Sequence, residues 1–269
     1  VAAIELAKQN FSVDLIEKTG ELGGNLRRVK LERGGLTGPQ LASRMINEVT
    51  KNKNITVRLN SKIKDISGYA GNFEIKIGDE TLKAGAIIVA TGAQEYVPKE
   101  YLYGQDKRVI TQTELEEKLS EGKIDAKKIV MIQCVGSRNE EVPYCSRVCC
   151  DAAVKNALSI KKQNPKSEVY VIHKDIRTYG FREESYKEAS EHGVNFIRVP
   201  EATPPVVTKK GDKIVVNVHD TVLGSDLSIT PDLVVLSTGI RPNPDNEELS
   251  KMLKVPLSKD KFFLDFDYG

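Results

Sequence analysis

Hydrophobic and polar positions over the first hundred residues follow two spacings, one helical and one typical of strands. Residues 1–9 place Ala3, Leu6 and Ala7 on one side of a helix. SVDLIEK (12–18) alternates and then runs apolar, as a parallel strand buried on both faces does. The other elements that the pattern predicts here are a helix at 37–53 capped by Thr37, short strands at 55–61, 62–67 and 72–78, and a strongly apolar strand, AGAIIVATGA, at 84–93.

A second unit opens near Val109 and repeats this order. Its predicted elements are helices at 113–122, 145–162 and 183–193, and strands at 127–136, 168–174, 194–200, 213–221 and 227–239. The motif ATGA (90–93) marks the end of a strand in the first unit, and STGI (237–240) marks the equivalent end in the second. The predicted fold class is α/β, with two tandem doubly wound, Rossmann-like dinucleotide-binding domains of the disulfide-oxidoreductase type.

We divide the chain on this basis into three parts. The predicted parts are an FAD-binding domain at 1–108, an NAD(P)-like domain with an inserted cysteine site at 109–241, and a return segment to the FAD domain at 242–269. Residues 1–9 read as a helix already under way, and FFLDFDYG (262–269) has no recognisable finish. We therefore expect a truncated chain.

Composition narrows the class of protein. The chain has 269 residues, of which 39% are hydrophobic and 29% charged, as in an ordinary globular protein. Its formal net charge is +2 and its basic residues are scattered, which gives no electrostatic reason to expect nucleic acid as a partner. No apolar run approaches the roughly 20 residues of a membrane-spanning helix, and the N-terminus lacks the pattern of a secretory signal. We expect a cytoplasmic protein.

The first unit carries the second half of a nucleotide site. Glu17, at the end of the strand 12–18, is placed to hydrogen-bond the ribose hydroxyls of an adenine dinucleotide. Gly23 and Gly24 let backbone approach a cofactor closely. The glycine-rich turn that cradles the pyrophosphate is expected immediately before Val1 and is not in this sequence.

All four cysteines of the chain lie within CVGSRNEEVPYCSRVCC, from Cys134 to Cys150. Here the strand 127–136 runs into a turn with Gly136 alone, where a second G-x-G-x-x-G turn is expected. Cys145 and Cys149 are four residues apart and so share one face of the predicted helix, whose N-terminus stabilises thiolates. Four soft ligands suit an iron–sulfur cluster or a zinc ion.

Three interpretations of these cysteines stay open at this point. We favour a [4Fe–4S] cluster bound by all four, with zinc as a lesser variant, since the spacing lacks the paired C-x-x-C of most zinc sites. The second is a redox pair, Cys145 with Cys149 or Cys149 with Cys150, and the third is four inert buried thiols. His173, Lys174 and Arg177 follow a strand where an NADPH-dependent relative grips the 2′-phosphate, and we interpret them as a solvated basic loop.

The motifs MIQCVGSR and YCSRVCC, preceded by ITQTELEE and followed by DIRTYG, resemble the flavin-containing subunit of heterodisulfide reductase and its relatives, which include a quinone-interacting oxidoreductase of sulfate reducers. The resemblance covers essentially the whole chain and implies a thioredoxin-reductase-like core with FAD and an unusual [4Fe–4S] cluster. Cys134, Cys145, Cys149 and Cys150 match the cluster ligands. The positions that match the FAD contacts are Glu17, Lys18, Gly23, Gly24, Ile63, Thr91 and Gly92.

The function that this resemblance implies is electron transfer between FAD and the cluster, with electron bifurcation at the flavin. The expected partners are other iron–sulfur subunits of a hetero-oligomeric redox complex and a second copy of this chain. No catalytic side chain is expected, because the cofactors carry the reaction. The alternative is an NAD(P)H-dependent pyridine nucleotide-disulfide oxidoreductase that uses a redox cysteine pair, and a zinc-stabilised scaffold is a third candidate.

Overall fold

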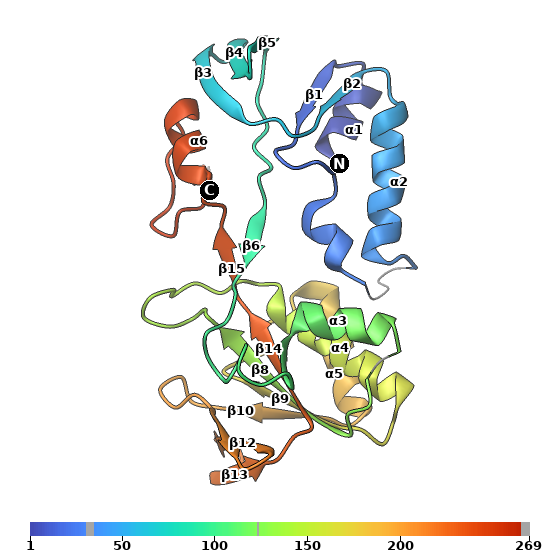
Figure 1. Ribbon diagram of the computed structural model, residues 1–269, viewed down its shortest axis with the longest axis vertical. Coiled ribbons are helices and arrows are strands. Elements are labelled where there is room, and N and C mark those ends of the chain that lie inside the picture. Colours follow the sequence, from blue (N-terminus) through green and yellow to red (C-terminus); the bar gives the residue numbers. More distant parts are fainter. Residues whose placement is uncertain (31–34, 123, 265–269) are drawn as a thin grey trace. The chain divides into compact units, whose positions relative to one another are not determined.

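A computed structural model describes residues 1–30, 35–122 and 124–264 (Figure 1). The chain forms two units and passes twice from one to the other. Unit 1 is formed by Val1–Ala93 with Pro242–Gly269, and unit 2 by Gln94–Arg241. The passages lie at β6 (Ala93–Glu95) and β15 (Ile240–Pro242), which pair with each other. The last five residues of the predicted return segment and of FFLDFDYG lie outside the described residues.

Unit 1 begins with two helices that pack on a pair of parallel strands. The helices α1 (Ala2–Lys8) and α2 (Gly38–Lys51) bury apolar side chains against β1 (Val13–Ile16) and β2 (Ile55–Arg58). Thr37 caps α2 as predicted, and the side chain of Gln40 accepts a hydrogen bond from the Thr37 N–H. The other elements of unit 1 are the 3-10 helix η1 (Gly24–Arg28), the antiparallel sheet β3 (Ile63–Tyr69), β4 (Asn72–Ile77) and β5 (Glu80–Ala84), and the helix α6 (Asn246–Leu253).

The predicted strand at 84–93 is wrong. The strand β5 ends at Ala84 and β6 begins at Ala93, and residues 85–92 pair with no described strand. A strand exists only with a hydrogen-bonding neighbour, and without one the apolar run is left partly in solvent, with Ile88 59% and Val89 39% exposed. ATGA therefore does not mark a strand end, whereas STGI follows directly from β14 (Leu233–Thr238).

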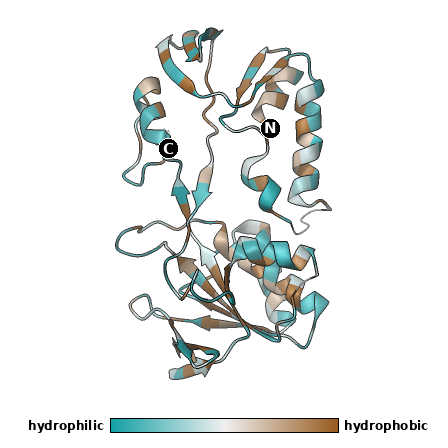
Figure 2. Cartoon of the chain, in the orientation of Figure 1, coloured by the Kyte–Doolittle hydropathy of each residue, from teal (hydrophilic) through white to brown (hydrophobic). Residues whose placement is uncertain are grey.

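Unit 2 is built on a five-stranded parallel sheet in the order β10-β9-β8-β14-β7. Its remaining strands are β7 (Val109–Thr111), β8 (Lys128–Val135), β9 (Glu168–His173) and β10 (Val194–Arg198). The inner strands are the most buried part of the described chain, and they are mostly brown in Figure 2. Ile129, Val130 and Met131 of β8 have no exposed surface, as expected for a continuous apolar run covered on both faces.

Two layers cover this sheet. The helices α3 (Gln112–Ser120), α4 (Cys149–Gln163) and α5 (Glu183–Glu191) pack on one face (Figure 1). The second layer is a three-stranded antiparallel sheet, whose Ile214 and Val216 pack with Val130 and Ile132 of β8. Since successive side chains of a strand alternate between faces, β8 contributes side chains to both layers. The remaining elements of unit 2 are β11 (Val206–Lys210), β12 (Lys213–Asp220), β13 (Ser225–Ile229) and the 3-10 helix η2 (Gly180–Arg182).

The predicted helix at 145–162 begins four residues later than expected, at Cys149. Arg147 has φ +63, a left-handed conformation that no α-helix contains, and the backbone N–H of Ile240 donates to Ser146 Oγ at 2.9 Å. The chain is thus turned away from a helical path before Cys149. The expectation that Cys145 and Cys149 share one helix face is therefore wrong.

Candidate functional site

Cys134 lies in a bulge at the carboxyl end of β8. Between the pairs Ile132–Leu236 and Val135–Thr238, β8 has two residues where β14 has one. Cys134 has φ +61, which is rare for a residue with a side chain. The thiol is buried, and that burial raises its pKa to about 11. The bulge re-aims Cys134 at the edge of the sheet where a nucleotide binds in doubly wound folds.

Cys145 lies in a loop that is tied to Ile240, the first residue of β15. The phenol of Tyr144 donates to the carbonyl of Ile240 at 2.9 Å, and Ser146 accepts from the N–H of the same residue. The N–H of Arg147 donates to Cys145 Sγ at 3.4 Å. Sequence reasoning could not find these anchors, because the partner residue lies nearly a hundred positions away.

Cys149 and Cys150 are the first two residues of α4 and are both buried. The interaction between these two neighbouring thiols raises the pKa of Cys149 and lowers the pKa of Cys150. An N–H from the backbone of Arg177 also stabilises the Cys150 thiolate.

The four thiols influence one another electrostatically. Cys145 and Cys150 both raise the pKa of Cys134, and Cys134 and Cys145 both raise that of Cys149. All four are free thiols. Within the described ranges, no three His, Cys, Asp or Glu side chains are close enough together to hold one metal ion. The cysteines therefore share one neighbourhood without forming a preassembled site for a single ion.

The position expected for the second nucleotide is filled by protein. Gly136 follows β8, and a Cβ added to it lies 2.1 Å from the ring of Tyr96. That ring also stacks with the guanidinium of Arg241 at 4.4 Å, and its hydroxyl donates to Glu100 at 3.2 Å. A glycine that elsewhere opens space for a pyrophosphate here makes room for an aromatic side chain.

The interpretation of His173, Lys174 and Arg177 as a solvated basic loop is wrong. His173 is buried, and burial lowers its pKa to about 4. Lys174 Nζ donates to the carbonyl of Arg138 at 2.5 Å, and Arg177 pairs with Asp175 at 3.0 Å. Lys174 and Arg177 are therefore paired with residues of the loops around the cysteines and are not free in solvent.

The predicted FAD positions in unit 1 are connected by side-chain hydrogen bonds. The Glu17 carboxylate accepts from the N–H and the hydroxyl of Thr19, both at 2.8 Å, which fixes its orientation after β1. Lys18 Nζ pairs with Asp245 at 2.7 Å and donates to Asn243 at 3.2 Å. The backbone amides of residues 60 and 61 bond to the carbonyls of Thr19 and Glu17, which brings the start of β3 at Ile63 to the same place.

The second half of this network reaches the Thr-Gly turn. Asn243 Nδ2 donates to the carbonyl of Thr91 at 3.3 Å, and Thr91 Oγ1 bonds to Asn246 at 3.2 Å. Asn25 Nδ2 donates to the carbonyl of Ala93 at 2.9 Å, which links the Gly23–Gly24 turn to Gly92. Gly23 and Gly24 both have positive φ, and a Cβ on Gly24 or Gly92 meets nothing within 4 Å. These bonds join the segments that carry Lys18 and Thr91, and sequence reasoning missed Asn25, Asn243 and Asn246.

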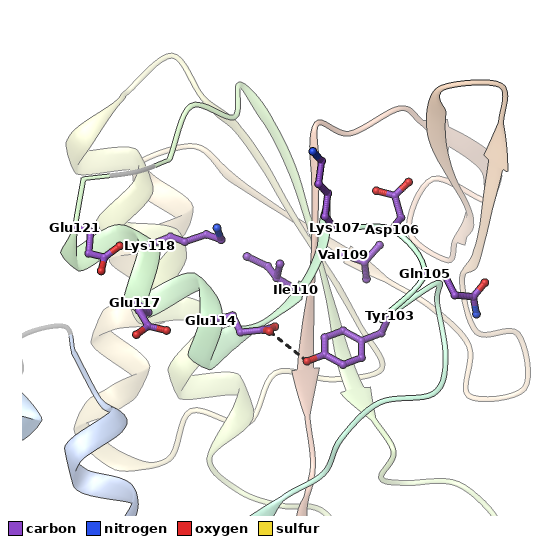
Figure 3. Close-up of a pocket in the computed structure, with 11 residues that line it drawn as sticks. Tyr103, Gln105, Asp106, Lys107, Val109, Ile110, Glu114, Glu117, Lys118 and Glu121 are labelled. Carbon is purple, nitrogen blue, oxygen red and sulfur yellow. Dashed lines mark hydrogen bonds between the residues drawn. The ribbon is translucent and has the colours of Figure 1, made fainter.

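A hollow on unit 2 is lined by charged residues of α3 and the segment before β7 (Figure 3). In it, the Tyr103 hydroxyl donates to Glu114 at 3.2 Å. Asp106 pairs with Arg108 at 2.7 Å, which holds the pKa of this carboxyl well below its usual range. None of the four cysteines is among its lining residues, so this hollow is separate from the site described above.

Comparison with known proteins places the chain in a family. Residues 1–265 match the family described as pyridine nucleotide-disulphide oxidoreductase. The chain belongs to this family. The predicted α/β fold and the prediction of an oxidoreductase are confirmed at this level.

Relatives of this oxidoreductase include components of heterodisulfide reductases. The chain is 43% identical over 204 residues to a CoB–CoM heterodisulfide reductase iron-sulfur subunit of Methanocaldococcus jannaschii, covering 68% of this chain and 30% of that one. It is 30% identical over 372 residues to the corresponding iron-sulfur subunit of Methanopyrus kandleri, covering 97% and 55%. The resemblance indicated by the cysteine motif is confirmed. The chain spans from about a third to about half the length of these relatives.

Solved structures confirm the fold of the family member. Thioredoxin reductase of Lactococcus lactis superposes with a TM-score of 0.62 at 18% identity, covering 99% of this chain and 80% of that one. The T. acidophilum thioredoxin reductase gives 0.59 at 19%, covering 97% and 79%. Among the described residues, every helix is too short or too polar to span a bilayer.

Proposed function

We propose that the chain is the flavin-binding part of a heterodisulfide-reductase-like electron-transfer protein. In this proposal unit 1 holds FAD, and unit 2 holds a [4Fe–4S] cluster through Cys134, Cys145, Cys149 and Cys150. Electrons pass between the two groups. The cluster exchanges single electrons, whereas FAD accepts them singly or in pairs.

One observation carries the proposal: sulfur has replaced the nucleotide turn of unit 2. Cys134 lies near the end of the central strand β8, Cys149 and Cys150 begin α4, and Tyr96 fills the space beside Gly136. Ser137 adds support, since its buried hydroxyl has no hydrogen-bond partner in the described part of the chain. A buried hydroxyl of this kind fits a site whose acceptor is supplied by a bound group.

The sequence spacing of the cysteines favours a cluster over one zinc ion, because it lacks the paired C-x-x-C of most zinc sites. Four thiolates at about 2.3 Å from a single zinc ion stand about 3.8 Å from one another. In a cubane each thiolate binds a different iron, so the four sulfurs stand further apart. The described cysteines influence one another electrostatically, which agrees with four ligands of one bound group.

In unit 1, the proposed cofactor site uses the seven predicted positions, of which Lys18 and Thr91 are joined by the hydrogen-bond network. Glu17 and Lys18 are assigned to the ribose, Ile63 to the adenine through its backbone, and Gly23 with Gly24 to close backbone approach. Thr91 and Gly92 are assigned to the flavin. Gly24 and Gly92 have the open space beside the backbone that such an approach requires.

The proposed partners and reaction of the whole protein are based on the names of its relatives. Two of them are named as subunits of reductases that act on a CoB–CoM heterodisulfide and on ferredoxin. We propose that the whole protein works in such a complex with other iron–sulfur subunits, pairs with a second copy of itself, and bifurcates electrons at the flavin. Four free thiols in one site also fit the reducing cytoplasm.

The deciding experiment is anaerobic purification of the protein followed by iron, acid-labile sulfide, zinc and flavin analysis. We expect iron and sulfide in equal amounts, and a reduced-state EPR signal that disappears in a Cys149→Ser variant. The matched control is Ser159→Ala, a change of similar size on α4 away from the cysteines. Stoichiometric zinc without sulfide would falsify the cluster and leave the scaffold alternative.

A second function is favoured by one observation, the adjacency of the two buried thiols Cys149 and Cys150 at the start of α4. In that case NADPH reduces the flavin, and the flavin reduces a cysteine pair. The test is to add NADPH anaerobically and to follow the flavin absorbance and the number of titratable thiols. Rapid bleaching with two new thiols in an iron-free protein supports this alternative. An unchanged spectrum agrees with the filled position beside Gly136.

A further inference from the structure

Arg138, whose side chain is largely but not fully buried, shares an acidic partner with a second arginine next to the cysteines. The side chain of Arg138 is 12% exposed, and its Nη1 donates to Asp175 Oδ1. Arg177 donates to the same carboxylate through Nε at 3.2 Å and Nη2 at 3.0 Å. Asp175 therefore bridges two permanent positive charges.

This bridge borders the proposed cluster ligands. The carbonyl of Asp175 lies 4.0 Å from Cys150 Sγ. Cys145 raises the pKa of Arg177, and Arg138 lowers the pKa of Cys134, so each arginine lies within electrostatic reach of one of these sulfurs. The two arginines thus flank the ligands from β8 and from the loop before α4, with the acidic partner between them.

Charged side chains next to the proposed cluster change its reduction potential. A [4Fe–4S] group with four thiolate ligands carries a double negative charge when oxidised, and one-electron reduction adds a third. A nearby cation stabilises the more negative state more strongly, so it raises the reduction potential, and a nearby anion lowers it. The effect is largest for groups that are poorly screened by water.

We propose that Arg138, with Asp175 as its counter-charge, sets the reduction potential of the group bound by the four cysteines. This inference rests on the proposed function. It assigns Arg138 and Asp175 the role of positioning and tuning residues, since neither is a ligand. Arg138 favours the reduced state, and Asp175 offsets part of that effect through the shared hydrogen bonds.

A second carboxylate near Arg138 offers an internal comparison. Glu201 accepts from Arg138 Nη2 at 3.5 Å and from Lys174 at 3.3 Å, but its side chain is 67% exposed, against 39% for Asp175. Solvent screens an exposed carboxylate strongly. Removing the charge of Asp175 must therefore shift the potential further than removing the charge of Glu201.

The test is an EPR-monitored redox titration of the anaerobically purified protein, following the signal that is absent from Cys149→Ser. For Arg138→Gln we expect a potential lowered by at least a tenfold change in the one-electron equilibrium constant, which is about 59 mV. For Asp175→Asn we expect an upward shift, and for Glu201→Gln a smaller upward one. Arg138→Lys keeps the charge and restores most of the wild-type potential.

The outcomes separate this inference from the proposed function. A wild-type protein without iron and sulfide contradicts both. The inference alone is contradicted if the protein binds the cluster but Arg138→Gln and Asp175→Asn both have the wild-type reduction potential. Shifts of both variants in the same direction also contradict it. If Arg138→Gln binds no cluster, the sign of the Asp175→Asn shift decides. The distant charge variant Lys213→Gln is the control and must leave the potential unchanged.

Discussion

At the scale of single residues, the cysteine loop is held in backbone conformations that side chains disfavour. Cys134, Arg138 and Arg147 have φ of 61, 54 and 63 degrees. Each left-handed residue of this kind costs roughly 1 kcal/mol or more, and such residues persist only where the surroundings fix them. Here the surroundings include the bonds of Tyr144 and Ser146 to Ile240. We infer that the protein, and not a bound group alone, shapes this loop.

The contact between Gly136 and Tyr96 leads to a prediction about stability. In Gly136→Ala the new Cβ meets the Tyr96 ring at 2.1 Å and the residue keeps φ +69, so we expect a loss of roughly 3 kcal/mol in unfolding free energy. Gly180→Ala is the matched control, with φ +59 and open space, and we expect about 1 kcal/mol. Urea unfolding measures both. Equal losses contradict the close packing.

The buried histidine predicts a dependence of stability on pH. His173 has its pKa lowered by burial from 6.5 to about 4, so below pH 6.5 the unfolded state takes up the proton first. Stability contributed by neutral His173 is complete above pH 6.5 and is lost as pH falls towards 4, on the order of 3 kcal/mol in all. Urea unfolding at several pH values measures this slope. A His173→Gln variant with the same slope contradicts the assignment.

At the scale of elements, prediction succeeded where burial alone determines structure. The run IVMI of β8 is apolar because helices and a second sheet cover both of its faces, and the sequence displays that directly. Prediction failed where the structure of a segment depends on contacts with residues elsewhere in the chain. The similar run at 85–92 has no neighbouring described strand, and α4 begins at Cys149 because a left-handed Arg147 precedes it. The exposed strand β11 carries too weak a pattern to be detected.

The unpaired run at 85–92 predicts a difference in amide exchange. In the chain of 269 residues, we expect these amides to exchange orders of magnitude faster than those of β8, because β8 has strands on both sides and the run at 85–92 pairs with no described strand. Hydrogen–deuterium exchange with mass spectrometry compares the two segments in one sample. Slow exchange at 85–92 comparable to that of β8 contradicts the absence of a ladder there.

At the scale of the whole molecule, each predicted cofactor site combines segments that are far apart in the sequence. The cysteine site needs β8, the start of α4 and the loop at 174–177. The flavin site of unit 1 needs residues near 17, 91 and 243. Motifs allowed the cysteines and the glycines to be proposed as site residues, because those residue types carry the chemistry. The asparagines that join the segments were missed, since a hydrogen bond between residues so far apart in the chain leaves no local pattern.

A substitution of Asn243 tests whether the hydrogen bonds that join these segments matter for flavin binding. Its side chain accepts from Lys18 and donates to the Thr91 carbonyl, so Asn243→Ala releases both proposed contact segments from each other. We expect about tenfold weaker FAD binding, corresponding to about 1.4 kcal/mol, measured by fluorescence titration of flavin-depleted protein. Glu248→Gln is the control, because Glu248 pairs with exposed Lys62 at 2.7 Å and is not tied to Thr91. If both variants bind FAD as the wild type does, the network serves folding and not the cofactor, and the assignment of Lys18 and Thr91 must be abandoned.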